Sequence, residues 1–489
     1  MSDEKPGVYS AQWTRKNAEG KDETVSGSLE IRDDYPSHLI HLTGDFADLG
    51  GGIPAFFSGA EEADLYPVIH GATQNGFYTA IDSRPGSSRR RYGGGLSDIV
   101  LRPSFMIKGS MLLREHELEV TEVSLRIWDQ DAWADWYNFH IDNSGADVVV
   151  TQKAMPKHTV RIGNAVISLE DISDQHHFPD SGKLTLNQRS AFHFAFDDAI
   201  PLRDFMADWM RPLGFWISSG TRRTSGVDSM SIRSKHWVSD IDGSAMDTWL
   251  EVIPRNPKGG KVEGEIDFLH QFKHFNFEKQ FPMVLDTFKN HQTAIDQFLD
   301  YTHTTPATAL VQLTTFAQIV ETFDRSLSPD TEMTEAQRSA MQSLGKLMAD
   351  DPALKKFASK ATQGVAESHR PTLARRLSRL DKATGKLVSN EIQRPDWKSE
   401  VADIRNSVVH GLPSSALFQT NIIPLQVSVS ILRVLFEARL LVAMGFTPEQ
   451  VKQMITRYDL RWMLKKAMIT SYLDSFDTFK NWKPGLLHG

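Results

Sequence analysis

An arginine and a histidine in the last fifth of the chain have the residue types that RNA cleavage requires. Four residues separate Arg405 from His410, and Asn406 directly follows the arginine. Metal-free RNA cleavage needs a base for the ribose 2′-OH proton, a cation for the charge that builds on the phosphate, and an acid for the leaving 5′-oxygen. A guanidinium binds phosphate oxygens in a fixed fork, and histidine exchanges protons near neutral pH. The pair can perform this chemistry, although chance alone gives about one such spacing in a chain of this length.

The residues around this pair predict an amphipathic helix over 395–411. Its core-facing side is formed by Val401, Ile404 and Val408. Asp403, Asn406 and His410 lie roughly opposite this side, with Arg405 on the flank. Gly411 ends the helix, so His410 belongs to the last turn, where the negative end of the helix dipole favours a protonated imidazole. The alternative is that Arg405 and His410 only decorate a bundle helix, and the residues alone leave both interpretations open.

A run of basic residues precedes this predicted helix. Its members are Arg370, Arg375, Arg376, Arg379, Lys382, Lys386 and Arg394. Cations gathered along one helix bind nucleic-acid phosphates without reading the sequence. All of them except Arg394 are predicted to contact the RNA backbone. A helix face that is merely solvated is the competing interpretation.

The composition limits the function classes. The chain has 489 residues, of which 40% are hydrophobic, so it can form two or three cored domains. Its net charge of −8 does not indicate general nucleic-acid binding, but a local basic groove remains compatible with it. The absence of cysteine excludes disulfides, thiolate metal sites and a cysteine nucleophile. No cofactor or metal site is expected. The start has no signal-peptide pattern, and charges interrupt the apolar stretch at 421–446, so a soluble cytoplasmic protein without membrane contact is predicted.

The period of the apolar residues changes near residue 265. Before it they alternate, as at 123–127, and turn sequences separate the runs, which indicates short antiparallel strands. One amphipathic stretch at 201–215 predicts an inserted helix. After residue 265 the helical period dominates. We therefore predict an α+β protein of two domains, with a β-sandwich-like or barrel module at 1–264, a helical connector at 265–304 and an all-α bundle at 305–489. Within the all-α bundle, helices are predicted at 307–325, 332–348, 352–362, 370–390, 395–411, 421–444 and 447–456.

Three local patterns have an ordinary and a more specific interpretation. The glycine-rich segment 84–95 predicts a loop rather than a strand, with an anion-binding loop as the alternative. His270 and His274 have a zinc-compatible spacing, but the adjacent phenylalanine favours a packed connector. His176 and His177 lie in a polar stretch and predict a turn.

The segment with Arg405 and His410 resembles the Arg-Asn-x3-His signature of HEPN domains (higher eukaryotes and prokaryotes nucleotide-binding). The predicted helical region around it is similar in length, with its motif near the end of one helix and a long apolar helix following. The N-terminal half resembles the β-rich domain of ApeA-like bacterial proteins at 25–29, 66–71 and 76–80. Together the two resemblances cover most of the chain.

These resemblances imply a metal-independent endoribonuclease that acts in antiphage defence by abortive infection. They imply that Arg405 stabilises the phosphate, that His410 is the general base or acid, that Asn406 orients them, and that Asp403 or Glu400 tunes the charge. HEPN domains typically pair, so a homodimer or larger homo-oligomer is expected. The predicted partners are RNA, with transfer RNA as one option, and a phage-derived trigger sensed by the N-terminal domain.

One departure and one alternative accompany the resemblance. Leu412 stands where toxin HEPN domains have the tyrosine of a His-x-Tyr ending, so neutralisation by modification of that tyrosine does not apply. The alternative function is a catalytically inactive HEPN domain that binds RNA or serves for dimerisation.

Overall fold

The fold is that of a computed structural model of the chain. It divides the chain into two compact units, 1–282 and 283–489, and each is described by itself. The division falls within the range predicted as a connector. The structure describes all residues except 1–5, 17–19, 33–37, 44–45, 47–65, 90–97, 110–117, 137–138, 145–148, 179–182, 224, 239–243, 255–267, 304–307, 329–333, 350–370, 413–417, 419–420, 464–476 and 478–489.

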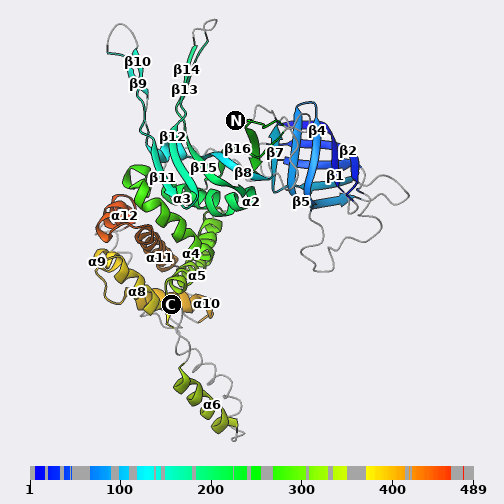
Figure 1. Ribbon diagram of the computed structural model, residues 1–489. Coiled ribbons are helices and arrows are strands. Elements are labelled where there is room, and N and C mark those ends of the chain that lie inside the picture. The colour runs from blue at the N-terminus through cyan, green and yellow to red at the C-terminus, as the bar shows by residue number, and fades with distance from the viewer. Residues whose placement is uncertain are drawn as a thin grey trace. The chain divides into compact units, whose positions relative to one another are not determined.

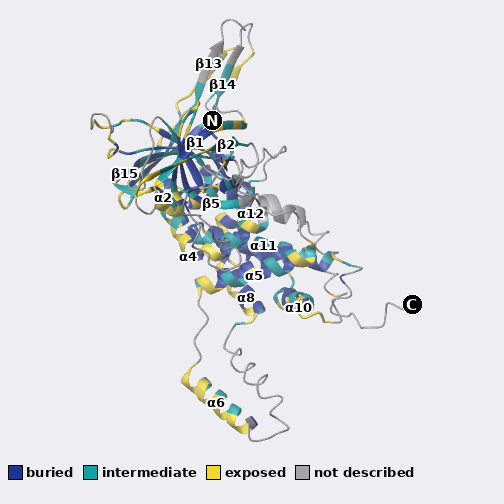
Figure 2. Ribbon diagram, turned by 90° about the vertical axis from the view of Figure 1, so that its right-hand side faces the viewer, coloured by how far each residue is buried: buried dark blue, intermediate teal, exposed yellow. Residues whose placement is uncertain are grey.

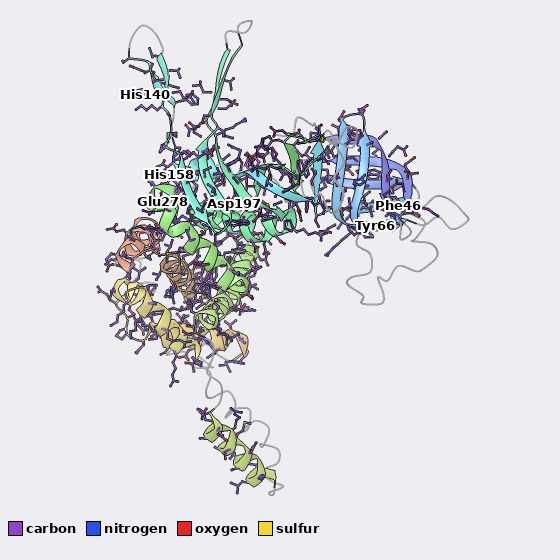
Figure 3. The ribbon with its side chains drawn as sticks, in the orientation of Figure 1. Phe46, Tyr66, His140, His158, Asp197 and Glu278 are labelled. Atoms are coloured by element: carbon purple, nitrogen blue, oxygen red, sulfur yellow. The ribbon has the colours of Figure 1, made fainter. Side chains whose placement is uncertain are left out.

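Six antiparallel strands of the first unit close into a barrel (Figure 1). They are β1 (Gly7–Lys16), β2 (Asp22–Ile31), β3 (His38–Thr43), β4 (Tyr66–Thr73), β5 (Gly76–Arg89) and β6 (Asp98–Arg102). The ring runs β5-β4-β1-β2-β3-β6 and returns to β5. Trp13, Ile40, Ile69 and Tyr78 fill its interior, and Phe46 lies beside Tyr66 with ring centroids 5.9 Å apart (Figure 3). Closure removes the exposed strand edges that an open sheet would leave.

The same sheet continues beyond the barrel to thirteen strands in all. The continuation follows the order β7 (Phe105–Gly109), β17 (Leu250–Pro254), β16 (Val227–Arg233), β8 (Glu119–Ile127), β15 (Ser190–Pro201), β12 (Ala165–Asp171) and β11 (His158–Ile162). Between β15 and β16 lies one helical stretch, composed of α2 (Leu202–Phe205), the π-helical turn η5 (Met206–Met210) and α3 (Arg211–Thr221). The helix predicted at 201–215 is therefore present, and it extends one and a half turns further.

Two hairpins project from this part of the sheet as narrow ribbons (Figure 1). One pairs β9 (Phe139–Asp142) with β10 (Val149–Gln152), and the other pairs β13 (Asp174–Phe178) with β14 (Lys183–Asn187). His176 and His177 lie in β13, so the predicted turn at these residues is wrong. Their polar neighbours are compatible with a strand here because a two-stranded ribbon has no face that must be buried.

The predicted loop at 84–95 is also wrong over its first half. Arg84 to Arg89 continue β5 and pair with β6. A shift of register between Pro85 and Ser87 marks a bulge, the position at which a strand tolerates proline. A cross-strand partner at 98–102 thus overrides the local preference of a polar, glycine-containing segment for a loop.

An aromatic cluster joins the helical stretch of the first unit to the segment that follows the sheet. Trp133 of α1 (Gln130–Ala134) contacts Trp216 edge-on with ring centroids 4.7 Å apart, and Phe275 lies 4.8 Å from Trp216. His270 is completely buried inside this cluster. Its Nδ1 accepts from Trp133 Nε1 at 3.3 Å, so its Nε2 carries the proton and donates to Ser219 Oγ at 3.1 Å.

These contacts favour the packed interpretation of His270 and His274. Only residues 272–274 form a 3₁₀ turn, η6 (Phe272–His274), so the two histidines do not lie one turn apart on an α-helix. His274 Nδ1 instead accepts from the backbone N–H of Gln271 at 2.9 Å.

His270 predicts a dependence of stability on pH. Burial lowers the pKa of His270 from 6.5 to about 3. Below pH ~6.5 the unfolded chain takes up a proton that the folded unit cannot, so the free energy of unfolding falls by ~1.4 kcal/mol per pH unit as the pH drops toward 3. Above pH ~6.5 this contribution is fully present. His270→Gln should reduce that slope, as measured by urea unfolding at several pH values, and an unchanged slope would contradict the assignment.

The second unit is helical. Its described helices are α4 (Phe277–His303), which begins in the first unit, α5 (Ala309–Leu327), α6 (Glu335–Ala349), α8 (Leu373–Ala383), α9 (Leu387–Ile392), α10 (Trp397–Val409), α11 (Ile423–Ala443) and α12 (Pro448–Met463). Phe436 of α11 packs against Phe298 of α4 and Phe323 of α5, with ring centroids 4.9 and 5.2 Å apart. Figure 2 shows mostly exposed residues along α6, in contrast to the buried residues of α5 and α11.

The antiparallel β-rich module followed by an all-α bundle is confirmed. One predicted helix, 370–390, is divided into α8 and α9, because Gly385 and Lys386 adopt φ values of +72° and +59°. The helix predicted at 352–362 lies outside the described residues.

Candidate functional site

Helix α10 carries Arg405 and His410, and its buried side fixes its orientation. Trp397, Val401 and Ile404 are completely buried. The buried carboxylate of Asp381 lies 3.2 Å from Lys398 Nζ and accepts from the Ser389 hydroxyl at 2.5 Å. Hydrophobic burial and this carboxylate hold α10 against α8 and α9. Asp403 and His410 are thereby left exposed, while Arg405 lies half-buried on the flank of the helix.

The end of α10 presents His410 to solvent. His410 is the C-cap residue, and Gly411 follows at φ +58°. The backbone N–H of Leu412 donates to Ser407 O at 3.0 Å, and that of Gly411 donates to Val408 O at 3.3 Å. This pair of bonds is a Schellman ending, which satisfies two carbonyls of the last turn. His410 is exposed, so its imidazole is accessible to a substrate.

Gly411 allows a test of how tightly this ending positions His410. A Cβ at Gly411 would meet no atom within 4 Å, so Gly411→Ala costs only the backbone strain of φ +58°, about 1 kcal/mol. Gly163, at φ +57° and equally open, is a matched control in the first unit. Both variants should lower the thermal midpoint similarly, but only Gly411→Ala should also slow the RNA cleavage that the resemblance to HEPN domains implies. Equal activities of the two variants would show that the ending does not position His410.

Arg405 is held by two neighbours. Its Nη1 donates to Asn406 Oδ1 at 3.1 Å, and its Nη2 lies 3.4 Å from Glu321 Oε1 on α5. The Arg405 side chain keeps 25% of its surface exposed. The structure thus joins Arg405, Asn406 and Glu321 in one group, with His410 five residues further along the same helix. A guanidinium placed in this way can turn to a phosphate without unfolding its helix.

The two acidic candidates of α10 differ in their surroundings. Glu400 is buried and binds Arg394 through both oxygens, at 2.6 and 2.7 Å. The hydrogen bonds that Arg394 donates to Glu400, and then to Asp477, raise the pKa of Arg394. Glu400 is therefore engaged in a structural ion pair away from Arg405. Asp403 is exposed on the same side of α10 as Asn406 and His410, and it remains the acidic candidate near the site.

The predicted RNA-binding residues of α8 and its flanks that the structure describes fall into three groups. Arg375, Lys382 and Lys386 are exposed and remain candidates. Arg376 is buried and bonded to buried Asp324 of α5 at 2.9 Å, so its assignment to RNA contact is corrected, because breaking that pair would leave a buried charge alone. Arg379 also donates to Asp324 but keeps 40% of its side chain exposed. Arg370 lies outside the described residues.

Sequence reasoning missed the contribution of α5. Glu321 and Asp324 lie one turn apart and contact arginines of α10 and α8. Burial lowers the pKa of Arg439 on α11, and the negative charge of Asp324 offsets part of this lowering. The only signal in the sequence was the position of Asp324 among the apolar residues of its helix, and nothing in the sequence names the partners of the two acids.

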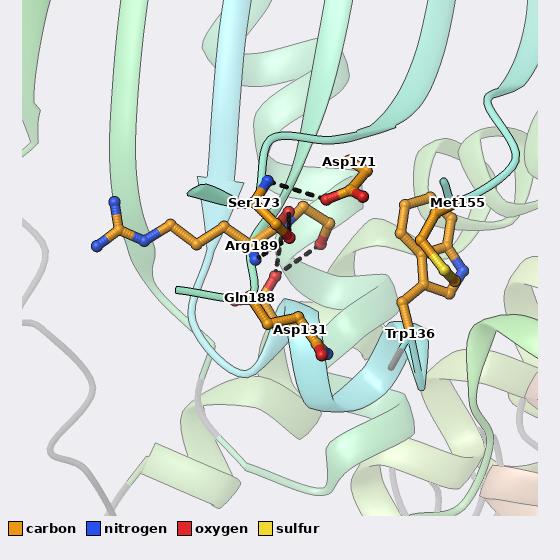
Figure 4. A pocket seen from close by; sticks show the side chains of 8 residues that line it. Asp131, Trp136, Met155, Asp171, Ser173, Gln188 and Arg189 are labelled. Carbon is orange, nitrogen blue, oxygen red and sulfur yellow. Dashed lines mark hydrogen bonds between the residues drawn. The ribbon is translucent and has the colours of Figure 1, made fainter. Parts of the chain in front are cut away.

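Away from α4, α5, α8 and α10, no further site emerges from the part of the chain that the structure describes. Within it, no group of three or more histidine, aspartate or glutamate residues could hold a metal ion. A depression near the base of the hairpins contains Asp131 and Asp171, which accept from Ser190 N at 2.6 Å and Ser173 N at 2.9 Å (Figure 4). It has no room for a water-sized molecule, so it is a packing feature. Among the described helices, none has the length and apolarity to cross a membrane.

Comparison with known families agrees with this division of the chain. Residues 9–211 match the family described as ApeA N-terminal domain 1, and residues 314–450 match the family described as Apea-like HEPN. The chain therefore has the ApeA-like architecture, with a β-rich N-terminal domain followed by an HEPN domain. The second match contains Glu321, Arg405 and His410. No curated protein and no solved structure matches the chain.

Proposed function

We propose that the chain is a metal-independent endoribonuclease of the HEPN class. The observation that carries the proposal is the outer face of α10. A half-buried arginine with a phosphate-compatible fork is followed, five residues further along, by an exposed histidine at the helix C-terminus. Both lie inside the region that matches the HEPN family. No ligand set for a metal is required, because the arginine supplies the positive charge and the histidine exchanges the proton.

The roles follow from the chemistry of the two side chains. Arg405 stabilises the charge that develops on the phosphate as the 2′-oxygen attacks it. His410 accepts the proton of the 2′-OH or donates one to the 5′-oxygen as it leaves, and Asn406 orients the guanidinium through the 3.1 Å hydrogen bond. The products are a 2′,3′-cyclic phosphate and a 5′-OH. Asp403, an exposed acid on the same helix, is the candidate for tuning the charge of the site.

The architecture also suggests the biological setting. A β-rich ApeA-type domain joined to an HEPN domain supports a role in antiphage defence, in which a phage-derived trigger acts on the first domain and the second cuts cellular RNA. Transfer RNA is the proposed substrate class. The test is gel analysis of total RNA after expression of the wild type beside His410→Ala. Discrete fragments in the wild type alone support the function, and identical RNA patterns contradict it.

One observation favours a second function. Glu321 partly neutralises Arg405, and a permanently neutralised arginine would serve only a binding or dimerisation module. The same gel separates the two functions, because an inactive HEPN domain would leave the RNA intact while still binding it.

The proposed reaction predicts a homodimer with a shared site. One Arg405 and one His410 supply a single cation and a single proton carrier, whereas the reaction uses a base, an acid and charge stabilisation. Two chains around a two-fold axis double the set. Mixing Arg405→Ala with His410→Ala protein should restore part of the cleavage that each lacks. A monomer by light scattering that still cuts RNA would contradict the shared site.

A further inference from the structure

One carboxylate of α5 contacts arginines from two helices. Glu321 Oε1 lies 3.4 Å from Arg405 Nη2 of α10, and Glu321 Oε2 lies 3.5 Å from Arg325 Nη2 on α5 itself. The side chain of Glu321 is 16% exposed, against 25% for Arg405 and 53% for Arg325. Two guanidinium groups that solvent can reach therefore flank one acid beside the candidate active site.

The contacts around Glu321 and Asp324 form a cluster of these two acids with Arg325, Arg376, Arg379 and Arg405. One turn along α5, Asp324 neutralises Arg376 in the interior and also receives a bond from Arg379. Three arginines of the cluster, Arg325, Arg379 and Arg405, retain exposed surface. Of its two acids, Asp324 is buried and Glu321 is partly exposed. The local field rather than the net charge of −8 decides where an anion binds. The cluster is thus suited to receive an anion.

We propose that Arg325 binds the RNA phosphate adjacent to the one that Arg405 binds, and that Glu321 holds both guanidinium groups until phosphates replace it. The two contacts of Glu321, at 3.4 and 3.5 Å, are at the long limit of a hydrogen bond. Phosphate oxygens form shorter, two-pronged bonds with a guanidinium, so the exchange favours the nucleic acid. This assignment rests on the proposed ribonuclease function and adds two residues of α5 to its substrate site.

The arrangement favours two linked phosphates over a single anion. Arg405 and Arg325 approach different oxygens of the Glu321 carboxylate, from α10 and from α5. Since the acid lies between them, each guanidinium can face its own phosphate. A strand with a phosphate at every nucleotide supplies two such groups at once, whereas inorganic phosphate supplies one.

The test measures RNA affinity in a background that cannot cut. In full-length His410→Ala protein, binding of a fluorescein-labelled single-stranded RNA is followed by anisotropy at several salt concentrations. Arg325→Ala should weaken binding about tenfold and reduce the slope of log affinity against log salt by about 0.7. Glu321→Gln, which removes the competing charge but keeps the side-chain shape, should strengthen binding about threefold or more.

The opposite effects of Arg325→Ala and Glu321→Gln on RNA affinity distinguish phosphate binding at this cluster from a purely structural role. Arg338→Ala and Glu335→Gln, two exposed positions of α6, are matched controls and should change affinity less than about twofold.

If both α5 variants weaken binding, Glu321 is only a structural partner and the inference fails. If the wild type cuts RNA but the α5 variants bind like the controls, the inference fails while the proposed function stands. If the α5 variants behave as predicted but the wild type cuts no RNA, the phosphate site stands and the ribonuclease function fails. If the parent protein binds no RNA, both fail.

Discussion

His410→Ala is expected to reduce RNA cleavage by about 10²–10⁴-fold, the contribution of a positioned general acid or base. The same substitution should change the free energy of unfolding by less than ~0.5 kcal/mol, because an exposed C-cap side chain contributes little packing. The Schellman bonds at this end of α10 use backbone atoms, so they survive the loss of the imidazole. The measurement combines cleavage of a labelled RNA with urea unfolding of both proteins.

A second histidine provides the control for this result. His140 of β9 is exposed and lies in one of the projecting hairpins of the first unit (Figure 3). His140→Ala should cut RNA at the wild-type rate. Near-normal cleavage by His410→Ala would remove His410 from the reaction, and unfolding of His410→Ala would indicate a structural role instead.

Arg405→Lys is expected to reduce cleavage by about 10²-fold and Arg405→Ala by about 10³-fold. Lysine keeps the charge but loses the planar fork that binds two phosphate oxygens. Stability should fall by only about 0–1 kcal/mol, since the ion pair with Glu321 is partly exposed and its contact is long. The rates come from single-turnover kinetics with saturating enzyme, and Arg338→Lys on α6 is the control. A lysine variant as fast as the wild type would show that the fork of the guanidinium is not used.

The face of α10 could be predicted from the sequence because it depends on local periodicity. The buried positions of Val401 and Ile404 and the glycine ending at Gly411 follow from spacing and backbone preference alone. Those features placed His410 in the last turn. The residue types of Arg405 and His410 indicate the chemistry, and the family resemblance of this segment favours it over a merely structural role.

The contacts around Arg405 could not be predicted in the same way. Glu321 precedes Arg405 by 84 residues, and their meeting depends on how α5 and α10 pack. Arg376 and Arg379 looked equivalent on the sequence, yet the packing of α8 buries one and leaves the other half exposed. Charge patterns along one helix do not reveal which of its residues face a neighbour.

The first unit shows the same limit for strands. Alternating apolar residues predicted antiparallel strands correctly, but a closed ring depends on the pairing of β3 with β6, two strands far apart in sequence. The strand at Arg84 to Arg89 exists because β6 supplies its hydrogen bonds, which a local preference for loops cannot indicate.

The most direct test of the account is the chemistry of the RNA ends that the purified protein leaves in excess EDTA. Wild-type protein and His410→Ala are incubated with a defined transfer RNA, and the fragments are examined for their terminal groups. The account predicts that the wild type cuts in EDTA and leaves 2′,3′-cyclic phosphate and 5′-OH ends, and that His410→Ala leaves the RNA intact. Cleavage that stops in EDTA and returns with Mg²⁺ or Mn²⁺, or fragments with 5′-phosphate ends, would contradict it.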